Sequence, residues 1–431
     1  MKKALLLSVV ASTMIMAGGN ITPAPVPAPA PVPAVEDASG WEFGGQGVLY
    51  YQTRDNMAMD LFDSEVSKAA AGIQLRAENK DLLGGFGVGF EISGISDFYL
   101  YDGVVSGLVQ NAGNGLDPRD SDVVNSSAAF TQAYLTYGIG NTSIKVGRQN
   151  LPKALSPFAF SEGWNVFKNS FEAALVVNTD IPDTALVGAY VWRSNSSLGA
   201  AGLNAFTDLS VLDVAAPGVA VADNGVFMLT AQNKSVDGLT LTGTYYYASE
   251  MVNKTDDVSI IWGDAAYAAD TFNVAVQGGS VLLDTTGLED TTAFGAKIGA
   301  KLGMFTATVA YSSVDDGTTA IENIGTNVKT PLYTQLILNQ NFIKHDSDTF
   351  VVKAGVKALG GNFGAAYNYS EFGAADNEYT EFDLTYKTKV FADTTTLFVG
   401  YVYTDIDADK DLDGHDIDGQ NLVRVWGRYN F

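Results

Sequence analysis

Apolar and polar residues alternate along most of the chain after Trp41. In the segment 377–389, for example, Phe382 and Leu384 alternate with Glu381 and Asp383. Strict alternation predicts β-strands with one apolar and one polar face. About eighteen segments show it, and their lengths are close to what a tilted strand needs to cross a membrane. The segments are 41–53, 67–79, 86–96, 129–137, 142–149, 171–178, 184–194, 224–233, 239–250, 257–267, 271–279, 291–301, 304–313, 348–359, 362–372, 377–389, 394–405 and 420–431.

The connections between these segments alternate between short and long. Residues 138–141 and 302–303 form short ones, whereas 97–128 and 314–347 form long ones. Short periplasmic turns and long outer loops are typical of outer-membrane barrels, and an even strand number places both barrel ends on one side. The sequence therefore predicts an all-β fold, a transmembrane antiparallel β-barrel of about 18 strands.

The charged residues share one face of each predicted strand. In the last segment, Arg424 and Arg428 lie on the face opposite Val423 and Val425, and the chain ends on the aromatic Phe431. A charged residue that faces lipid near mid-bilayer costs about 2–4 kcal/mol, so the charged face is expected to line the interior. A barrel of this size encloses a wide lumen, which predicts a water-filled pore.

The first residues have the pattern of an export signal. Lys2 and Lys3 precede a short apolar stretch that ends in small residues near Ala17. The stretch is shorter than the roughly 20 residues that a spanning helix needs. We interpret 1–18 as a signal peptide, 19–40 as a Pro-rich periplasmic spacer and 41–431 as the barrel domain.

Composition narrows the function further. The chain has no Cys, two His and a formal net charge of −24. Thiolate chemistry and disulfides are excluded, and an acidic exported protein is a poor binder of nucleic acid. No catalytic motif is present, so we expect no enzyme. The expected partners are the lipid bilayer, lipopolysaccharide and small hydrophilic solutes.

The third long connection, 150–170, carries the most specific local pattern. Gly147-Arg148-Gln149 precedes it, Ser156-Pro157 lies within it, and Phe171-Glu172-Ala173 follows it. Here the chain resembles the OprD-type and Campylobacter-type major outer membrane porins. The resemblance implies that this third outer loop folds into the lumen and forms the pore constriction, and that the protein assembles as a homotrimer.

The resemblance also implies a set of charges across the constriction. Opposed acidic and basic groups in a narrow passage create a transverse field that filters dipolar and charged solutes. The alternative for each residue is a charge that is simply solvated in a wide lumen. Arg148 falls on the lipid-facing side by alternation from Lys145, so either it lies above the membrane or the strand ends there. The candidate constriction residues are Lys153, Glu162, Lys168, Glu172, Lys145, Arg424 and Arg428.

The last outer loop is rich in Asp. Asp409, Asp411, Asp413 and Gly414 match the first half of a calcium loop, but the twelfth position is Gln420 instead of Glu. An EF-hand is excluded, which leaves either a weaker Ca²⁺ site or a solvated acidic loop. We expect no other cofactor.

These observations predict an outer membrane porin, a passive diffusion channel for ions and small hydrophilic solutes. The acidic balance favours weak cation selectivity. Two alternatives stay open. One is a substrate-specific channel for small carboxylates or amino acids. The other is a surface adhesin that uses the long loops 97–128, 195–223 and 314–347.

Overall fold

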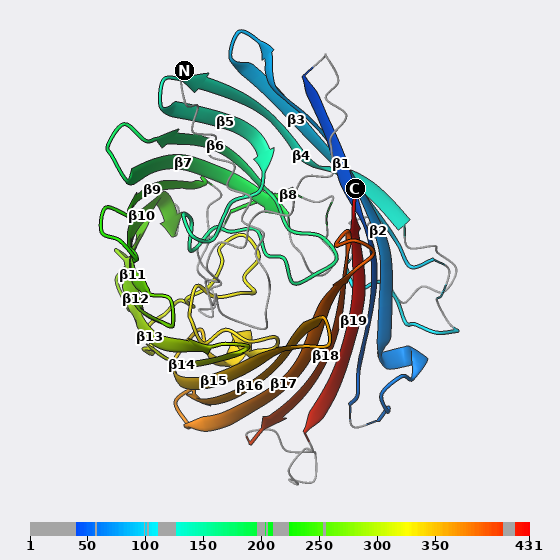
Figure 1. Ribbon diagram of the computed structural model, residues 1–431. Helices are drawn as coiled ribbons and strands as arrows, with labels where there is room; N and C mark the ends of the chain where they lie inside the picture. The colour runs from blue at the N-terminus through cyan, green and yellow to red at the C-terminus, as the bar shows by residue number, and fades with distance from the viewer. Residues whose placement is uncertain are drawn as a thin grey trace.

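The strands close into one barrel (Figure 1). The computed structural model describes residues 40–56, 58–98, 100, 103–110, 126–195, 203, 206–209, 224–252, 256–407 and 419–431. The predicted signal peptide and nearly all of the Pro-rich spacer lie outside these residues, as do most of the connections 97–128 and 195–223.

The strands follow the predicted order. They are β1 (Trp41–Arg54), β2 (Ser67–Leu83), β3 (Phe86–Ser96), β4 (Ser126–Ile139), β5 (Thr142–Gln149), β6 (Phe171–Asn178), β7 (Thr184–Asn195), β8 (Phe206–Asp208), β9 (Val226–Asn233), β10 (Leu239–Val252), β11 (Asp256–Ala268), β12 (Phe272–Leu283), β13 (Thr291–Leu302), β14 (Phe305–Val314), β15 (Ser347–Ala358), β16 (Gly361–Phe372), β17 (Asn377–Val390), β18 (Thr395–Ile406) and β19 (Gln420–Asn430). Two short 3₁₀ turns, η1 (Ser64–Val66) and η2 (Asn339–Phe342), lie in connections.

The barrel closes because β1 pairs antiparallel with both β2 and β19, with Tyr50 opposite Trp426. Eighteen strands form the ring, and β8 is one extra strand. It pairs with Arg193–Asn195 at the end of β7. The predicted fold class and ring of eighteen strands are confirmed. The alternation missed β8 because three residues are too few to show a period.

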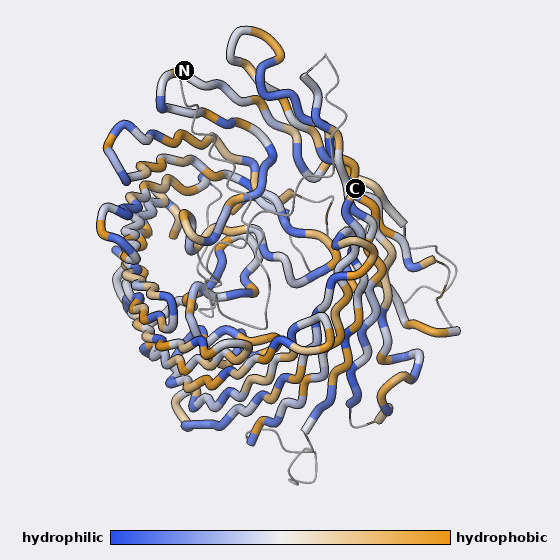
Figure 2. Tube along the Cα trace, in the orientation of Figure 1, coloured by the Kyte–Doolittle hydropathy of each residue, from blue (hydrophilic) through white to orange (hydrophobic). Residues whose placement is uncertain are grey.

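The two faces of each strand differ as predicted. On β17, Leu384 is 45% exposed on the outside, whereas Glu381 is 0% and Asp383 1% exposed on the inside. Figure 2 shows the same alternation of apolar and polar residues along the strands. Large apolar side chains such as Phe294 and Ile298 are exposed all along the outer face, where a membrane would cover them. Among the described residues, no helix has the length and apolarity that a membrane crossing requires.

Residues 150–170, here called the first inner segment, cross the lumen. At one side, Tyr50 on β1 donates a hydrogen bond to the Trp164 carbonyl (3.5 Å). At the other side, the Phe158 ring packs edge-on against Tyr246 on β10 and Trp262 on β11, with centroids 5.9 and 5.2 Å away. Because β1 lies about half-way round the ring from β10 and β11, a segment that contacts both must span the interior.

Residues 315–346, here called the second inner segment, also lie inside the barrel (yellow in Figure 1). Thr334 bonds Ser312 on β14, and Asn339 donates to Asn368 on β16 (2.9 Å). Leu332 is only 1% exposed. The sequence had placed this connection among the long outer loops that could serve an adhesin. The structure corrects this, because most of the segment is buried against the inner wall.

One apolar cluster joins both segments to the wall. Phe158 of the first inner segment and Ile321 and Leu332 of the second share it with Trp262. Each fully buried side chain of this size stabilises the arrangement by about 1.5–3 kcal/mol. Gly72 on β2 makes room for the first segment, because a Cβ there would lie 2.5 Å from Cζ of Phe167.

Candidate pore constriction

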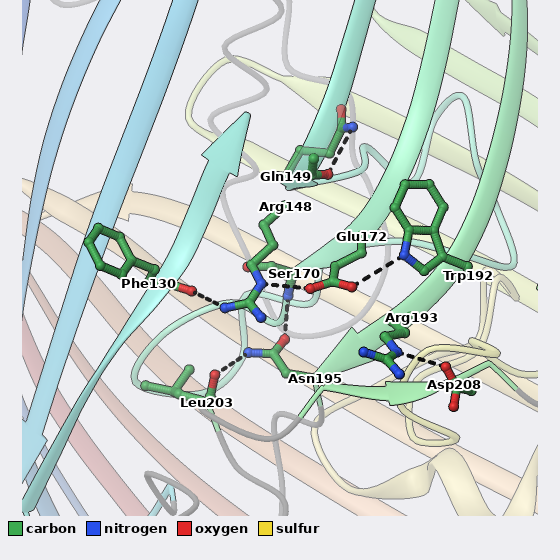
Figure 3. Close-up of polar contacts among 11 residues, drawn as sticks. Phe130, Arg148, Gln149, Ser170, Glu172, Trp192, Arg193, Asn195, Leu203 and Asp208 are labelled. Carbon is green, nitrogen blue, oxygen red and sulfur yellow. Dashed lines mark hydrogen bonds and ion pairs between the residues drawn. The ribbon is translucent and has the colours of Figure 1, made fainter. Parts of the chain in front are cut away.

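The two ends of the first inner segment are fastened to neighbouring strands. The Gln149 side chain donates to the Ala173 carbonyl (2.9 Å), and the Ser170 amide donates to Oδ1 of Asn195 (2.6 Å). On the outer face of β5 and β6, Nε of Arg148 lies 2.8 Å from Oε1 of Glu172 (Figure 3). This ion pair joins β5 and β6 next to the two ends of the first inner segment.

Glu162 lies where the two inner segments meet. The residue is only 2% exposed. Oε1 accepts hydrogen bonds from Asn323 Nδ2 (2.8 Å), Thr326 Oγ1 (2.5 Å) and the Lys329 amide (3.1 Å). Oε2 accepts one from Trp164 Nε1 (2.6 Å). Charge-assisted bonds of this number compensate the cost of burying a carboxylate. Glu162 therefore links two segments of the interior.

Two lysines flank this junction. Lys153 donates to the Thr330 carbonyl (2.8 Å), and burial, with the nearby Lys297 ammonium, lowers its pKa to about 7. Lys329 donates to the carbonyls of Leu336 (3.1 Å) and Ile337 (2.8 Å). Burial lowers the pKa of Lys329 to about 8, against the opposite effect of Glu162. Burial thus moves the pKa of both ammonium groups down toward neutral pH.

The two arginines of β19 approach the far end of the first inner segment. Arg424 donates to Gln52 (3.0 Å), and its guanidinium carbon lies 6.0 Å from the centroid of the Trp164 ring. Arg428 donates to the Asn165 carbonyl (3.4 Å). Lys168 lies nearby, where burial and then the Arg428 charge lower its pKa.

Solved structures with the same architecture are outer membrane proteins. OccAB2 of Acinetobacter baumannii aligns over 92% of this chain and 99% of its own, with a TM-score of 0.70 and 15% identity. OccK8 (OprE) of Pseudomonas aeruginosa aligns over 91% and 98%, with a TM-score of 0.69 and 13% identity. OpdK of the same organism, crystallised with vanillate, aligns over 90% and 98%, with a TM-score of 0.69 and 14% identity. The chain has the fold of an OprD-type outer membrane porin.

No family model matches the sequence, and no curated protein matches it. The OprD-type likeness is therefore carried by the tertiary structure. The apolar outer face is what a barrel of this fold presents to lipid when it spans a membrane.

Two candidate residues lie away from the junction. Lys145 on β5 sits over the Tyr134 ring, 3.5 Å from its centroid. Glu172 lies between Phe171 and Ala173, whose side chains pack in the inner apolar cluster, so its own side chain points to the outer face. There it bonds Arg148 and Trp192 (Figure 3). Glu172 is thus on the other side of the wall from the passage.

Several wall residues that hold the second inner segment were not among the sequence candidates. Glu381 on β17 accepts hydrogen bonds from the amides of Ile337 (3.0 Å) and Leu338 (2.9 Å). Lys353 on β15 donates to the Gln335 carbonyl (3.3 Å). The alternation had already placed both charges on the inner face. It could not show which segment they would hold.

The predicted calcium ligands Asp409, Asp411 and Asp413 lie outside the described residues. Within the described part of the chain, no group of three or more His, Cys, Asp or Glu side chains could hold a metal ion.

Proposed function

We propose that this protein is a porin, a passive diffusion channel for ions and small hydrophilic solutes. The observation that carries the proposal is the charged inner face of a closed barrel. Arg76, Lys168 and Lys387 reach water inside a wall whose outer face is apolar. Water-accessible charges within a membrane barrel provide a polar path for solutes.

The two inner segments narrow this path without any covalent chemistry. They bring Lys153 and Lys329 to one part of the lumen and approach Arg424 and Arg428 on the wall. Such a passage sorts solutes by size and charge. We expect no enzyme activity from this arrangement.

The direct test is conductance of the purified protein in a planar lipid bilayer. Stepwise current increases of uniform size are expected on insertion. A barrel that inserts, as shown by its resistance to extraction from the bilayer, and yet passes no current would contradict the channel.

Ion preference is a separate part of the proposal. The net charge of −24 favours weak cation selectivity through the wide mouths of the pore. A reversal potential measured under a potassium chloride gradient should therefore have the sign of cation preference. A chloride-favouring potential would contradict the cation preference and leave the proposed channel function intact.

One observation favours a second candidate, a substrate-specific channel for small carboxylates. The basic groups Lys153, Lys168, Lys329 and Arg428 gather around the inner segments, whereas Glu162 is sealed between those segments. Carboxylates would then block chloride current at low concentration. Equal effects of a carboxylate and of a neutral solute of the same size would argue for the general porin.

Three partner proposals remain from the sequence and the resemblance. A homotrimer should appear as a cross-linked species of three chains. Lipopolysaccharide should copurify with the barrel.

The Asp-rich last loop should bind Ca²⁺. Calorimetry of the double variant Asp409→Ala/Asp411→Ala should then show less heat of Ca²⁺ binding than the native protein; equal heats would remove the site.

A further inference from the structure

Trp164 lies at the point where the wall and both inner segments come together. It belongs to the first inner segment and is only partly buried. Lys329 Nζ, from the second inner segment, is 5.7 Å from its ring centroid, and the Arg424 guanidinium, from β19, is 6.0 Å away. Cations at such distances attract the face of an indole ring. The ring therefore lies between parts of the molecule that are far apart in sequence.

A single buried carboxylate fixes this ring. Oε2 of Glu162 accepts the Trp164 Nε1 hydrogen at 2.6 Å. Oε1 of the same group accepts bonds from Asn323, Thr326 and the Lys329 amide. One oxygen thus orients the indole, and the other holds the second inner segment.

Each segment depends on the other through this group. Without the donors of the second segment, the Glu162 carboxylate would lie buried with too few hydrogen bonds, which is unfavourable. Without Glu162, the Asn323 amide and the Lys329 backbone amide would lose an acceptor in a place that water reaches poorly. Removing the charge should therefore loosen both segments together.

We propose that Trp164 determines the width of the passage and that Glu162 is its positioning residue, so the two inner segments act as one constriction. This inference rests on the proposed channel function. It departs from the expectation that Glu162 faces wall charges across the pore as part of a transverse field. Glu162 acts instead through the ring that it holds.

The test compares full-length wild-type protein with Glu162→Gln and Trp164→Ala in planar bilayers. Both variants should show a larger single-channel conductance and admit larger neutral polymers. The matched control is Glu322→Gln. Glu322 is also buried, lies on the second inner segment and pairs with Lys344 (2.6 Å). Its variant should conduct like the wild type.

A spectroscopic arm separates positioning from general destabilisation. The Trp164 emission is obtained by subtracting the spectrum of Trp164→Phe. In Glu162→Gln this component should become more accessible to iodide quenching. The barrel itself is monitored by its shift in gel mobility on heating.

The outcomes distinguish the two levels of the proposal. If the wild type conducts and neither conductance nor quenching changes in Glu162→Gln, the inference is wrong and the channel stands. If Glu162→Gln fails to fold, Trp164→Ala carries the test, and wild-type conductance in that variant overturns the inference. If the wild type itself does not conduct, the proposed channel function is wrong. Unchanged quenching in Glu162→Gln would by itself show that Glu162 does not position Trp164.

Discussion

The two inner segments have the same location and different origins in the sequence. The first, 150–170, is preceded by Gly147-Arg148-Gln149 and contains Ser156-Pro157, so a resemblance pointed to it. The second, 315–346, has no such pattern and was expected outside. Both nevertheless bury apolar side chains in one cluster with the wall. A loop enters the lumen when wall residues offer it partners, whether or not its own sequence predicts this position.

The segments also differ in how they are held. The first is fastened at its two ends, by Gln149 and Ser170, and is seated on Gly72. The second is held along its middle by wall charges, above all Glu381. Perturbing each kind of attachment separately should show which segment limits the passage.

The largest effect is expected from Glu381→Ala. This change leaves the buried Ile337 amide and the partly buried Leu338 amide without their acceptor. The cost is about 1–3 kcal/mol for each buried group left unsatisfied. The second inner segment should detach, which raises the conductance and lets trypsin cleave at Lys329 and Lys344. Glu371→Ala, on the neighbouring strand, removes an exposed carboxylate that bonds Tyr369 and serves as the control. Trypsin resistance equal to wild type in Glu381→Ala would show that this anchor is dispensable.

A smaller effect is expected when Gly72, where the first inner segment contacts the wall, is altered. In Gly72→Ala the new Cβ would meet the Phe167 ring at 2.5 Å. Overpacking of this kind costs about 1–3 kcal/mol, and displacement of the segment should widen the pore. Gly47→Ala on β1 is the control, because a Cβ there meets nothing within 4 Å. Urea unfolding and conductance measure both changes; identical behaviour of the two variants would contradict the proposed seat.

The ion pair at the base of the first segment should contribute less. Arg148 and Glu172 are 31% and 17% exposed at the side chain, so solvent screens their attraction. A double-mutant cycle with Arg148→Met and Glu172→Gln should give a coupling of about 0.2–1 kcal/mol. The pair Arg193–Asp208, more exposed at 46% and 36%, should give a weaker coupling. The reverse order would show that the base of the segment is not held by Arg148.

The smallest effect is a change of ion preference with pH. The pKa of Lys153 is lowered to about 7, so this ammonium is charged at pH 6 and largely neutral at pH 8. Loss of the positive charge as the pH rises should shift the reversal potential toward cation preference. Lys329, with a pKa of about 8, should add a second step at higher pH. The Lys153→Met variant should lack the first step; a titration curve unchanged in this variant would place Lys153 outside the conducting path.

Much of the architecture could be predicted from local patterns. The alternation located the strands of the ring to within a few residues, although β2 and β12 continue past the predicted ends to Leu83 and Leu283. It placed Glu381 and Arg424 on the inner face and Arg148 on the outer face. The alternation succeeds because a strand presents successive side chains to opposite sides. Glu381 and Arg424 point inward because a charge toward lipid is costly.

The composition of the constriction was less predictable. Glu162 was expected to face wall charges, yet its partners lie on a segment that the sequence had placed outside. Glu172 was expected near the passage, yet it lies behind the wall with Arg148. Lys329 carried no signal, because an irregular connection has no period from which a facing direction can be inferred.

The sequence by itself determined the barrel, its membrane-facing side and the inward direction of the wall charges, because these follow from interactions between each strand and its surroundings. Only the tertiary structure decided what fills the lumen. The decisive hydrogen bond there joins Glu162 to Lys329, 167 residues further along the chain. No local pattern can encode a contact of that kind, since it forms only after the wall has closed and brought the two inner segments together.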